Sequence, residues 1–132
     1  MKLELIMNDL HVFALGGQRI SWLTARSVAV ASNIANADVP NYQAKDVVSF
    51  EQTLSNVAPS ISTTHRLHFQ PPASTPGGIE LRNAAGPEFK HSGNTVSMET
   101  ELSKVGDIKS ANAITTGVLS AFHRMLLAST KG

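Results

Sequence analysis

Residues 31–42, "ASNIANADVPNY", combine a helical pattern with an abrupt end. Small and apolar residues at helical spacing suit a long helix, yet Asn33 and Asn36 stand among them. Helix interiors disfavour asparagine because its short amide competes for backbone hydrogen bonds. Pro40 then fixes φ ahead of Asn41, and asparagine is the residue that best tolerates a positive φ after glycine. The stretch therefore predicts the end of a helix followed by a tight turn.

The two asparagines can be explained in two ways. They can ease the helix toward its end, with one of them acting near the C-cap. Alternatively, an amide can be buried where it bonds a partner, and its loss would strand that partner. We expect the capping role for Asn36. For Asn33 we expect burial between subunits of an assembly, with the amide bonded to a neighbouring subunit.

Length and composition bound the class of protein. The 132 residues are enough for one domain, and 11 basic against 10 acidic side chains leave a formal charge of +1. This balance does not favour nucleic-acid binding, which normally concentrates basic residues. The absence of cysteine excludes disulfides and thiolate metal sites. Glu4, Asp9 and His11 interrupt any apolar leader, so we expect no cleaved signal peptide.

A seven-residue repeat runs through the first third of the chain and predicts a coiled-coil helix over residues 1–36. Its seam consists of Leu3, Leu10, Gly17, Thr24 and Ala31 together with Ile6, Phe13, Ile20, Ser27 and Ile34. Trp22, Leu23, Val28 and Val30 lie off this seam. Apolar residues on more than one face indicate a helix that is buried on several sides.

A similar repeat predicts a second coiled-coil helix over residues 97–130. Its seam consists of Met98, Val105, Asn112, Leu119 and Leu126, interleaved with Ile108, Thr115 and Phe122. Ser97 suits the N-cap, and Glu99 and Glu101 suit the positive end of the helix dipole. Asn112 either fixes the register of the seam or faces solvent.

The fold class predicted from these patterns is mainly α, with the two long helices paired as an antiparallel coiled-coil hairpin. The helix seams are candidates for assembly contacts, at Ile6, Leu10, Phe13, Ile20, Met98, Val105, Asn112, Leu119, Phe122 and Leu126. Four glycines, Gly16, Gly17, Gly106 and Gly117, lie within the helical patterns. They indicate either a break at 16–17 or close approach of neighbouring helices.

Residues 37–96 form an irregular middle region, and five of the six prolines lie between Pro59 and Pro87. Ser49 to Gln52 fits a capping box, which predicts a short helix over 49–57. Residues 67–69, 79–81 and 88–90 suit short extended segments, too few and too short for an independent sheet.

No catalytic or metal-binding motif is present in the sequence. It contains no nucleophile elbow, no paired-histidine metalloprotease motif and no glycine-rich phosphate loop. His65 and His68 have no third ligand nearby in the sequence, so they do not predict a metal site. We expect no enzyme activity and no cofactor.

The opening stretch resembles a motif of the flagellar rod and hook proteins, whose usual form is N-I-A-N-A-x-T-P-G-Y. The matching positions are Asn33, Ile34, Ala35, Asn36 and Ala37, followed by Pro40 and Tyr42, with departures at Val39 and Asn41. Residues 45–47, Thr64, His68, Gly93 and Asn94 also resemble the flagellar basal-body rod family, most closely a proximal rod member. The R-x-Y-E-A-N signature expected of FlgC and the distal proteins is absent.

The resemblance implies a structural subunit of the proximal rod in the periplasm. Such a subunit is exported by the flagellar type III apparatus and polymerises through its terminal helices. The implied partners are other copies of the chain, rod proteins of the FlgC, FlgF and FlgG types, a FliE-type adaptor, the membrane-ring protein FliF and the export apparatus. No nucleic acid or small-molecule substrate is implied. The alternatives are another rod protein such as FlgC, and a soluble helical-hairpin binding module of the export apparatus.

Overall fold

The computed structural model describes residues 2–55, 78–84 and 91–130, with side chains from residue 11 onward. Its elements are α1 (Lys2–Ala35), β1 (Lys45–Val47), α2 (Phe50–Ser55), β2 (Leu81–Asn83) and α3 (Met98–Thr130). The described chain is thus mainly helical, with long N- and C-terminal helices and a small sheet. This confirms the predicted class at that level. The coiled-coil hairpin itself stays a prediction.

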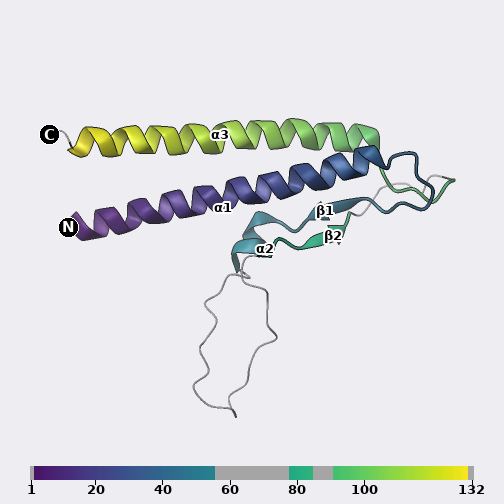
Figure 1. Cartoon of the computed structure of the whole chain (residues 1–132), viewed down its shortest axis with the longest axis horizontal. Coiled ribbons are helices and arrows are strands. Elements are labelled where there is room, and N and C mark those ends of the chain that lie inside the picture. Colours follow the sequence, from purple (N-terminus) through teal and green to yellow (C-terminus); the bar gives the residue numbers. More distant parts are fainter. Residues whose placement is uncertain (1, 56–77, 85–90, 131–132) are drawn as a thin grey trace, which may run out of the picture.

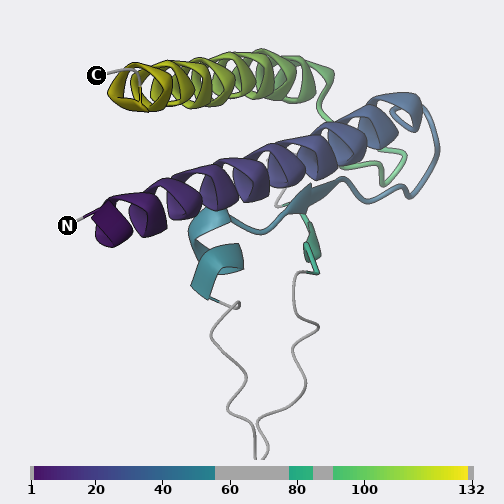
Figure 2. The same ribbon diagram turned by 60° about the vertical axis from the view of Figure 1, so that its left-hand side comes forward.

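The elements are arranged around α1. In both views α3 lies on one side of α1, and β1, β2 and α2 lie on the other (Figures 1 and 2). Helix α1 therefore packs on two sides, as its apolar residues on several faces predict. The two chain ends lie at the same end of the molecule (Figure 1).

The hydrophobic core lies where the sheet and α3 both approach α1. Its buried side chains are Trp22, Leu23, Val30, Val47, Phe50 and Ile108. Within one subunit, four predicted seam residues in this half of α1 are exposed, namely Gly17, Thr24, Ser27 and Ala31. The reason is that β1 and α2 bury a different face of α1 from the one that the heptad repeat marks.

Helix α1 continues through Gly16 and Gly17, so the alternative of a break at 16–17 is wrong. A Cβ on Gly16 would lie 2.6 Å from Cδ2 of Leu119, closer than real contacts allow. At this position the glycine permits close approach of α3. Gly17, Gly106 and Gly117 have nothing within 4 Å of such a Cβ within this chain.

In the middle region, β1 and β2 form a two-stranded antiparallel sheet. Lys45 pairs with Asn83 and Val47 with Leu81, and the Val48 N–H donates to the Glu80 carbonyl at 3.0 Å. The strand at 45–47 was not predicted, and the strand expected at 79–81 begins only at its last residue. The extended segments expected at 67–69 and 88–90 lie outside the described residues.

Helix α2 begins where the capping box predicts. The Gln52 N–H donates to Oγ of Ser49 at 3.3 Å, and the Thr53 N–H donates to the Ser49 carbonyl at 3.0 Å. Ser49 is therefore the N-cap. Phe50 places its ring in the core, so this cap fixes where the helix meets α1.

Candidate functional site

Asn36 supplies hydrogen bonds at the C-terminal end of helix α1. The Asn36 side-chain amide donates to the Ser32 carbonyl at 2.7 Å, and its backbone N–H donates to the same carbonyl at 3.1 Å. The Ala37 N–H donates to the Ile34 carbonyl at 3.2 Å. These bonds satisfy carbonyls in the last turn, as the capping explanation of Asn36 predicts.

The turn after α1 meets the segment that leads into α3. Asn41 has φ 60°, which confirms the predicted positive-φ turn, and Gly93 has φ 72°. The Asn41 N–H donates to the Ser92 carbonyl at 2.9 Å. A Cβ on Gly93 would meet Oδ1 of Asn41, so a larger residue would have to displace that side chain, and the positive φ independently favours glycine.

Asn94 joins this turn to α3. Its side-chain amide lies 3.0 Å from the Asn36 carbonyl, 3.0 Å from that of Ala37 and 2.7 Å from that of Val39. Its Oδ1 accepts a bond of 2.7 Å from the Val96 N–H, and the side chain is 1% exposed. The Ala37 carbonyl has no backbone donor among the described residues, whereas the Asn36 and Val39 carbonyls also accept from the N–H groups of Val39 and Tyr42. Asn94 thus bonds the turn that follows α1. We call residues 33–42 together with 92–97 the motif junction.

Asn33 is buried within the chain, not between subunits. It is 0% exposed, and its amide donates to the Lys45 carbonyl at 2.7 Å and to Oε2 of Glu101 at 3.0 Å. Its Oδ1 accepts from the Lys45 N–H at 2.9 Å and from the Tyr42 hydroxyl at 3.4 Å. Burial was predicted correctly, but the predicted partner was wrong. The side chain bonds α1 to β1 and to α3 of its own subunit.

A line of charges continues from Asn33 between α1, β1 and α3. Lys104 lies 2.9 Å from Oε1 of Glu101 and 3.2 Å from Oδ2 of Asp46. Arg26 Nε lies 3.2 Å from the other Asp46 oxygen. Glu101 lies in the first turn of α3, as predicted, but it is only 2% exposed and also belongs to this ion network. Arg26, Asp46, Glu101 and Lys104 are called the ion network below.

Two pKa values in the ion network are shifted. Burial alone raises the pKa of Asp46, but hydrogen bonds and charge from Arg26 and Lys104 outweigh burial and lower it below its ordinary 3.8. Burial alone lowers the pKa of Lys104, but its bonds to Glu101 and Asp46 outweigh burial and raise it above 10.5. Both groups are therefore held charged at neutral pH.

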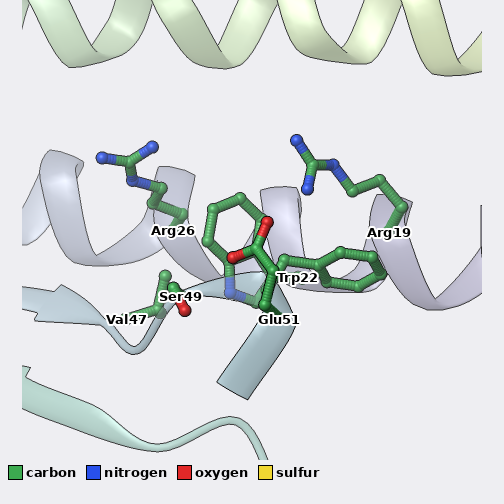
Figure 3. Close-up of a pocket in the computed structure, with 7 residues that line it drawn as sticks. Arg19, Trp22, Arg26, Val47, Ser49 and Glu51 are labelled. Atoms are coloured by element: carbon green, nitrogen blue, oxygen red, sulfur yellow. The ribbon is translucent and has the colours of Figure 1, made fainter. Parts of the chain in front are cut away.

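Arginines flank an aromatic pair on the face of α1 that carries α2. The Trp22 and Phe50 ring centroids lie 5.9 Å apart, and Trp22 Nε1 donates to the Val48 carbonyl at 2.8 Å. The guanidinium of Arg19 lies 5.1 Å from the Trp22 ring and that of Arg26 lies 5.5 Å from it. Figure 3 shows the two arginines on either side of Trp22 along the helix. They border an open hollow of about 300 Å³.

The structure places the remaining predicted residues in different environments. Phe13 and Phe122 meet edge to face, with ring centroids 5.9 Å apart. The seam residues that are half-buried are Phe13, Ile20, Val105, Asn112, Leu119, Phe122 and Leu126. Met98 is exposed. The side chains of Ile6 and Leu10 and all of Thr64 and His68 lie outside the description. Assembly through these residues stays a prediction.

Sequence reasoning missed the contacts of the ion network and the stacking of Arg19 and Arg26 against Trp22. The spacing of Glu101 and Lys104, three residues apart on a helix, was a readable signal for an ion pair. No comparable signal joins Arg26 to Asp46, because they come from different elements.

Neither a metal-ligand cluster nor a membrane-spanning helix occurs among the described residues. Nowhere in the described ranges do three His, Cys, Asp or Glu side chains gather as a metal site requires. Among those residues, no helix combines the length and apolarity needed to span a bilayer. Every buried side-chain N or O atom in this part of the chain has a hydrogen-bond partner. The arrangement is therefore suited to holding helices in place.

Comparison with characterised proteins gives a consistent set of relatives, although no protein-family model matches the chain. The chain is 30% identical to the flagellar basal body rod protein FlgB of Agrobacterium fabrum over 133 residues, covering 98% of this chain and 99% of that protein. It is 32% identical to FlgB of Aeromonas hydrophila over 70% of this chain and 71% of that protein. It is 33% identical to FlgB of Escherichia coli over 62% of this chain and 65% of that protein.

Proposed function

The chain belongs to the FlgB family of flagellar basal body rod proteins and is a structural subunit of the rod, and we propose that it occupies the proximal rod in the periplasm. In this proposal it leaves the cytoplasm through the flagellar type III apparatus without a cleaved signal. Support comes from similarity over nearly the whole chain and from the motif at residues 33–42. The names of the relatives describe rod proteins, not enzymes.

Polymerisation through the terminal helices is supported by one observation above all. Large apolar side chains remain exposed along both helices, at Leu15, Val28, Met98, Leu102, Ile114, Val118, Met125 and Leu127. Ile114, Val118 and Met125 recur at spacings of four and seven residues, so they share one side of α3, and larger exposed apolar patches mark interaction sites. A helical, head-to-tail assembly would bury the same faces repeatedly without closing into a small oligomer.

The motif junction has a supporting role in this proposal. Its bonds run within one subunit and join the end of α1 to the start of α3. They therefore set how the two long helices lie relative to each other before any neighbour binds. The terminal helices then pair as an antiparallel coiled coil whose outer faces meet other subunits.

The proposed partners follow from the position in the rod. They are other copies of the chain, rod proteins of the FlgC, FlgF and FlgG types, a FliE-type adaptor, the membrane-ring protein FliF and the export apparatus. No cofactor or metal has a place in this function.

A complementation experiment tests the proposal. In a strain that lacks its own copy, the wild-type chain should restore swimming and intact rods. Met125→Asp should abolish both, because the 60% exposed Met125 side chain would carry its charge into an interface only in the assembly. Met125→Leu is the matched control and should swim. Normal swimming of Met125→Asp would show that this face of α3 is not buried in the rod.

A further inference from the structure

Arg19 carries a guanidinium that the described residues leave without an acceptor. It lies 4.8 Å from the Phe50 ring centroid and 5.1 Å from that of Trp22, and it makes no ion pair in the described ranges. Arg26 differs, because its Nε and Nη2 lie 3.2 and 3.4 Å from the two oxygens of Asp46. Stacking on aromatic rings holds the Arg19 fork in place while its donors stay available for a carboxylate.

The surroundings of Arg19 form a socket for a side chain from outside. The hollow of about 300 Å³ is lined by residues of α1 and of the segment from Val47 to Glu51. It is open to solvent, and Figure 3 shows the Arg19 and Arg26 side chains bordering it. Leu15, four residues before Arg19 on the same side of α1, is 47% exposed. An incoming helix would therefore meet an apolar contact beside a cation.

Helix α3 carries a complementary pattern. Asp107 is exposed, makes no ion pair among the described residues, and is the last acidic residue of α3. Ile114 lies seven residues after Asp107, and Val118 lies four residues after Ile114, so all three share one side of the helix. Both apolar side chains are exposed. The arrangement is a carboxylate followed by apolar contacts.

The spacings of the two patterns are compatible. Leu15 lies four residues from Arg19 and seven from Trp22 on α1, about 6 and 10 Å of helix, and seven residues, about 10 Å, separate Asp107 from Ile114 on α3. An α3 lying antiparallel to α1, with Ile114 against Leu15, would place Asp107 beside Trp22 at the hollow, where the long Arg19 side chain has to reach toward it.

Asp107 of the same chain does not lie at the hollow. Gly16 of α1 faces Leu119 of α3, and Asn33 bonds Glu101. Within the chain, Asp107 is therefore beside the part of α1 around Val28, more than two helical turns from Arg19.

We propose that the hollow at Arg19 receives the Asp107 carboxylate of a second copy of this chain. The contact rests on the proposed function, in which copies assemble through their helices, and it names one pair of faces that meet. Arg19 would bind the carboxylate through its paired N–H donors, with Leu15 and Ile114 packed alongside. Because the site is partly desolvated by Trp22 and Phe50, the pair would contribute more than an exposed surface ion pair does.

A charge exchange tests the contact in a strain that lacks its own copy. Arg19→Asp and Asp107→Arg should each reduce the number of intact rods in purified basal bodies by about tenfold or more. The double variant restores opposite charges between every pair of copies, and rods should return to near the wild-type number. Two damaging single changes without recovery in the double variant would overturn the proposal, as would normal assembly of either single variant.

Glu51 of the same chain lines the same hollow, so its carboxylate is the alternative partner for the Arg19 guanidinium. If the socket is kept for a second copy, Glu51→Gln should assemble at least as well as wild type, because a competing negative charge is removed. Assembly as poor as that of Arg19→Asp would show that Glu51 is the partner, and the proposal would fail.

Cysteine cross-linking gives a second readout, because the natural chain has no cysteine. In oxidised basal bodies, a chain carrying both Leu15→Cys and Ile114→Cys should form a ladder at multiples of the single-chain mass. Each single variant is the control and should give no ladder. Monomer alone from the double variant would contradict the contact. If wild type restores rods but neither the charge exchange nor cross-linking succeeds, only this contact fails. If wild type restores no rods, the proposed function itself fails.

Discussion

The side-chain amide of Asn33 donates a 3.0 Å hydrogen bond to the carboxylate of Glu101, joining the last turn of α1 to the first turns of α3. Both side chains are fully buried. The second Glu101 oxygen bonds Lys104 at 2.9 Å, and Lys104 in turn reaches Asp46. A buried carboxylate is tolerated only when it is paired and hydrogen-bonded, as it is here. The relationship therefore makes the helix end and the ion network one structural unit.

Replacement of Asn33 by Ala should destabilise the folded subunit itself. The change leaves the Lys45 backbone groups and one Glu101 oxygen buried without their partner, at a cost of about 1–3 kcal/mol per stranded group. The measurement is a urea titration followed by fluorescence of Trp22, the chain's single tryptophan, which is buried near this unit. Asn33→Ala unfolding at the wild-type urea concentration would contradict the bonding described for this residue.

Replacement of Asn94 by Asp should open the motif junction. Aspartate has the same shape, but as a carboxylate it cannot donate to the carbonyls of Asn36, Ala37 and Val39. The buried charge and the lost donors should lower the unfolding free energy by about 2 kcal/mol or more. Asn41→Gly is the control, because glycine adopts the same positive φ, and it should be nearly neutral. Equal stability of Asn94→Asp and wild type in the same titration would refute this role.

Local signals explain why the helices and their ends could be predicted from the sequence. The heptad repeats span many turns, and the Asn36, Pro40 and Asn41 chemistry acts within a few residues of where it appears. Helix α1 ends at Ala35 and α3 begins at Met98, each within one residue of the predicted end. The short helix α2 was predicted for the same reason, since its Ser49 cap is local.

Contacts between distant segments explain what could not be predicted. Strand β1 forms only because residues 81–83 return to pair with it. The ion network joins Arg26 to Asp46, which lie 20 positions apart. Asn33 bonds Glu101 across 68 positions. No spacing rule connects the two residues of either pair. The pattern around Asn33 could show that a helical asparagine needs a buried partner. It could not show whether that partner belongs to the same subunit.

The ion network should make stability depend on pH at both extremes. Because the folded pKa of Asp46 is lowered, its contribution is present above 3.8 and is lost as pH falls through the folded pKa. Because the folded pKa of Lys104 is raised, its contribution is present below 10.5 and is lost as pH rises through the folded pKa. The stability difference between wild type and Asp46→Asn should therefore shrink as pH falls below 3.8. Urea midpoints measured across this range check it, and a difference that stays constant would contradict it.

Two adjacent glycines should respond differently to alanine. Gly17→Ala adds a methyl group into open space within the chain and should stabilise α1 by up to about 1 kcal/mol. Gly16→Ala gains the same helix propensity but must displace Leu119, so it should be clearly less stable than Gly17→Ala. Urea midpoints of the two variants give the comparison. Equal midpoints would mean that Gly16 does not set the approach of α3.

The position of the chain in isolated basal bodies tests the central claim most directly. Basal bodies purified from a strain carrying an epitope-tagged, functional copy should retain the chain after membrane and soluble proteins are washed away. Labelled antibody should mark the rod next to the membrane ring. Recovery of the chain only in the soluble fraction, with complete rods that lack it, would contradict its role as a rod subunit.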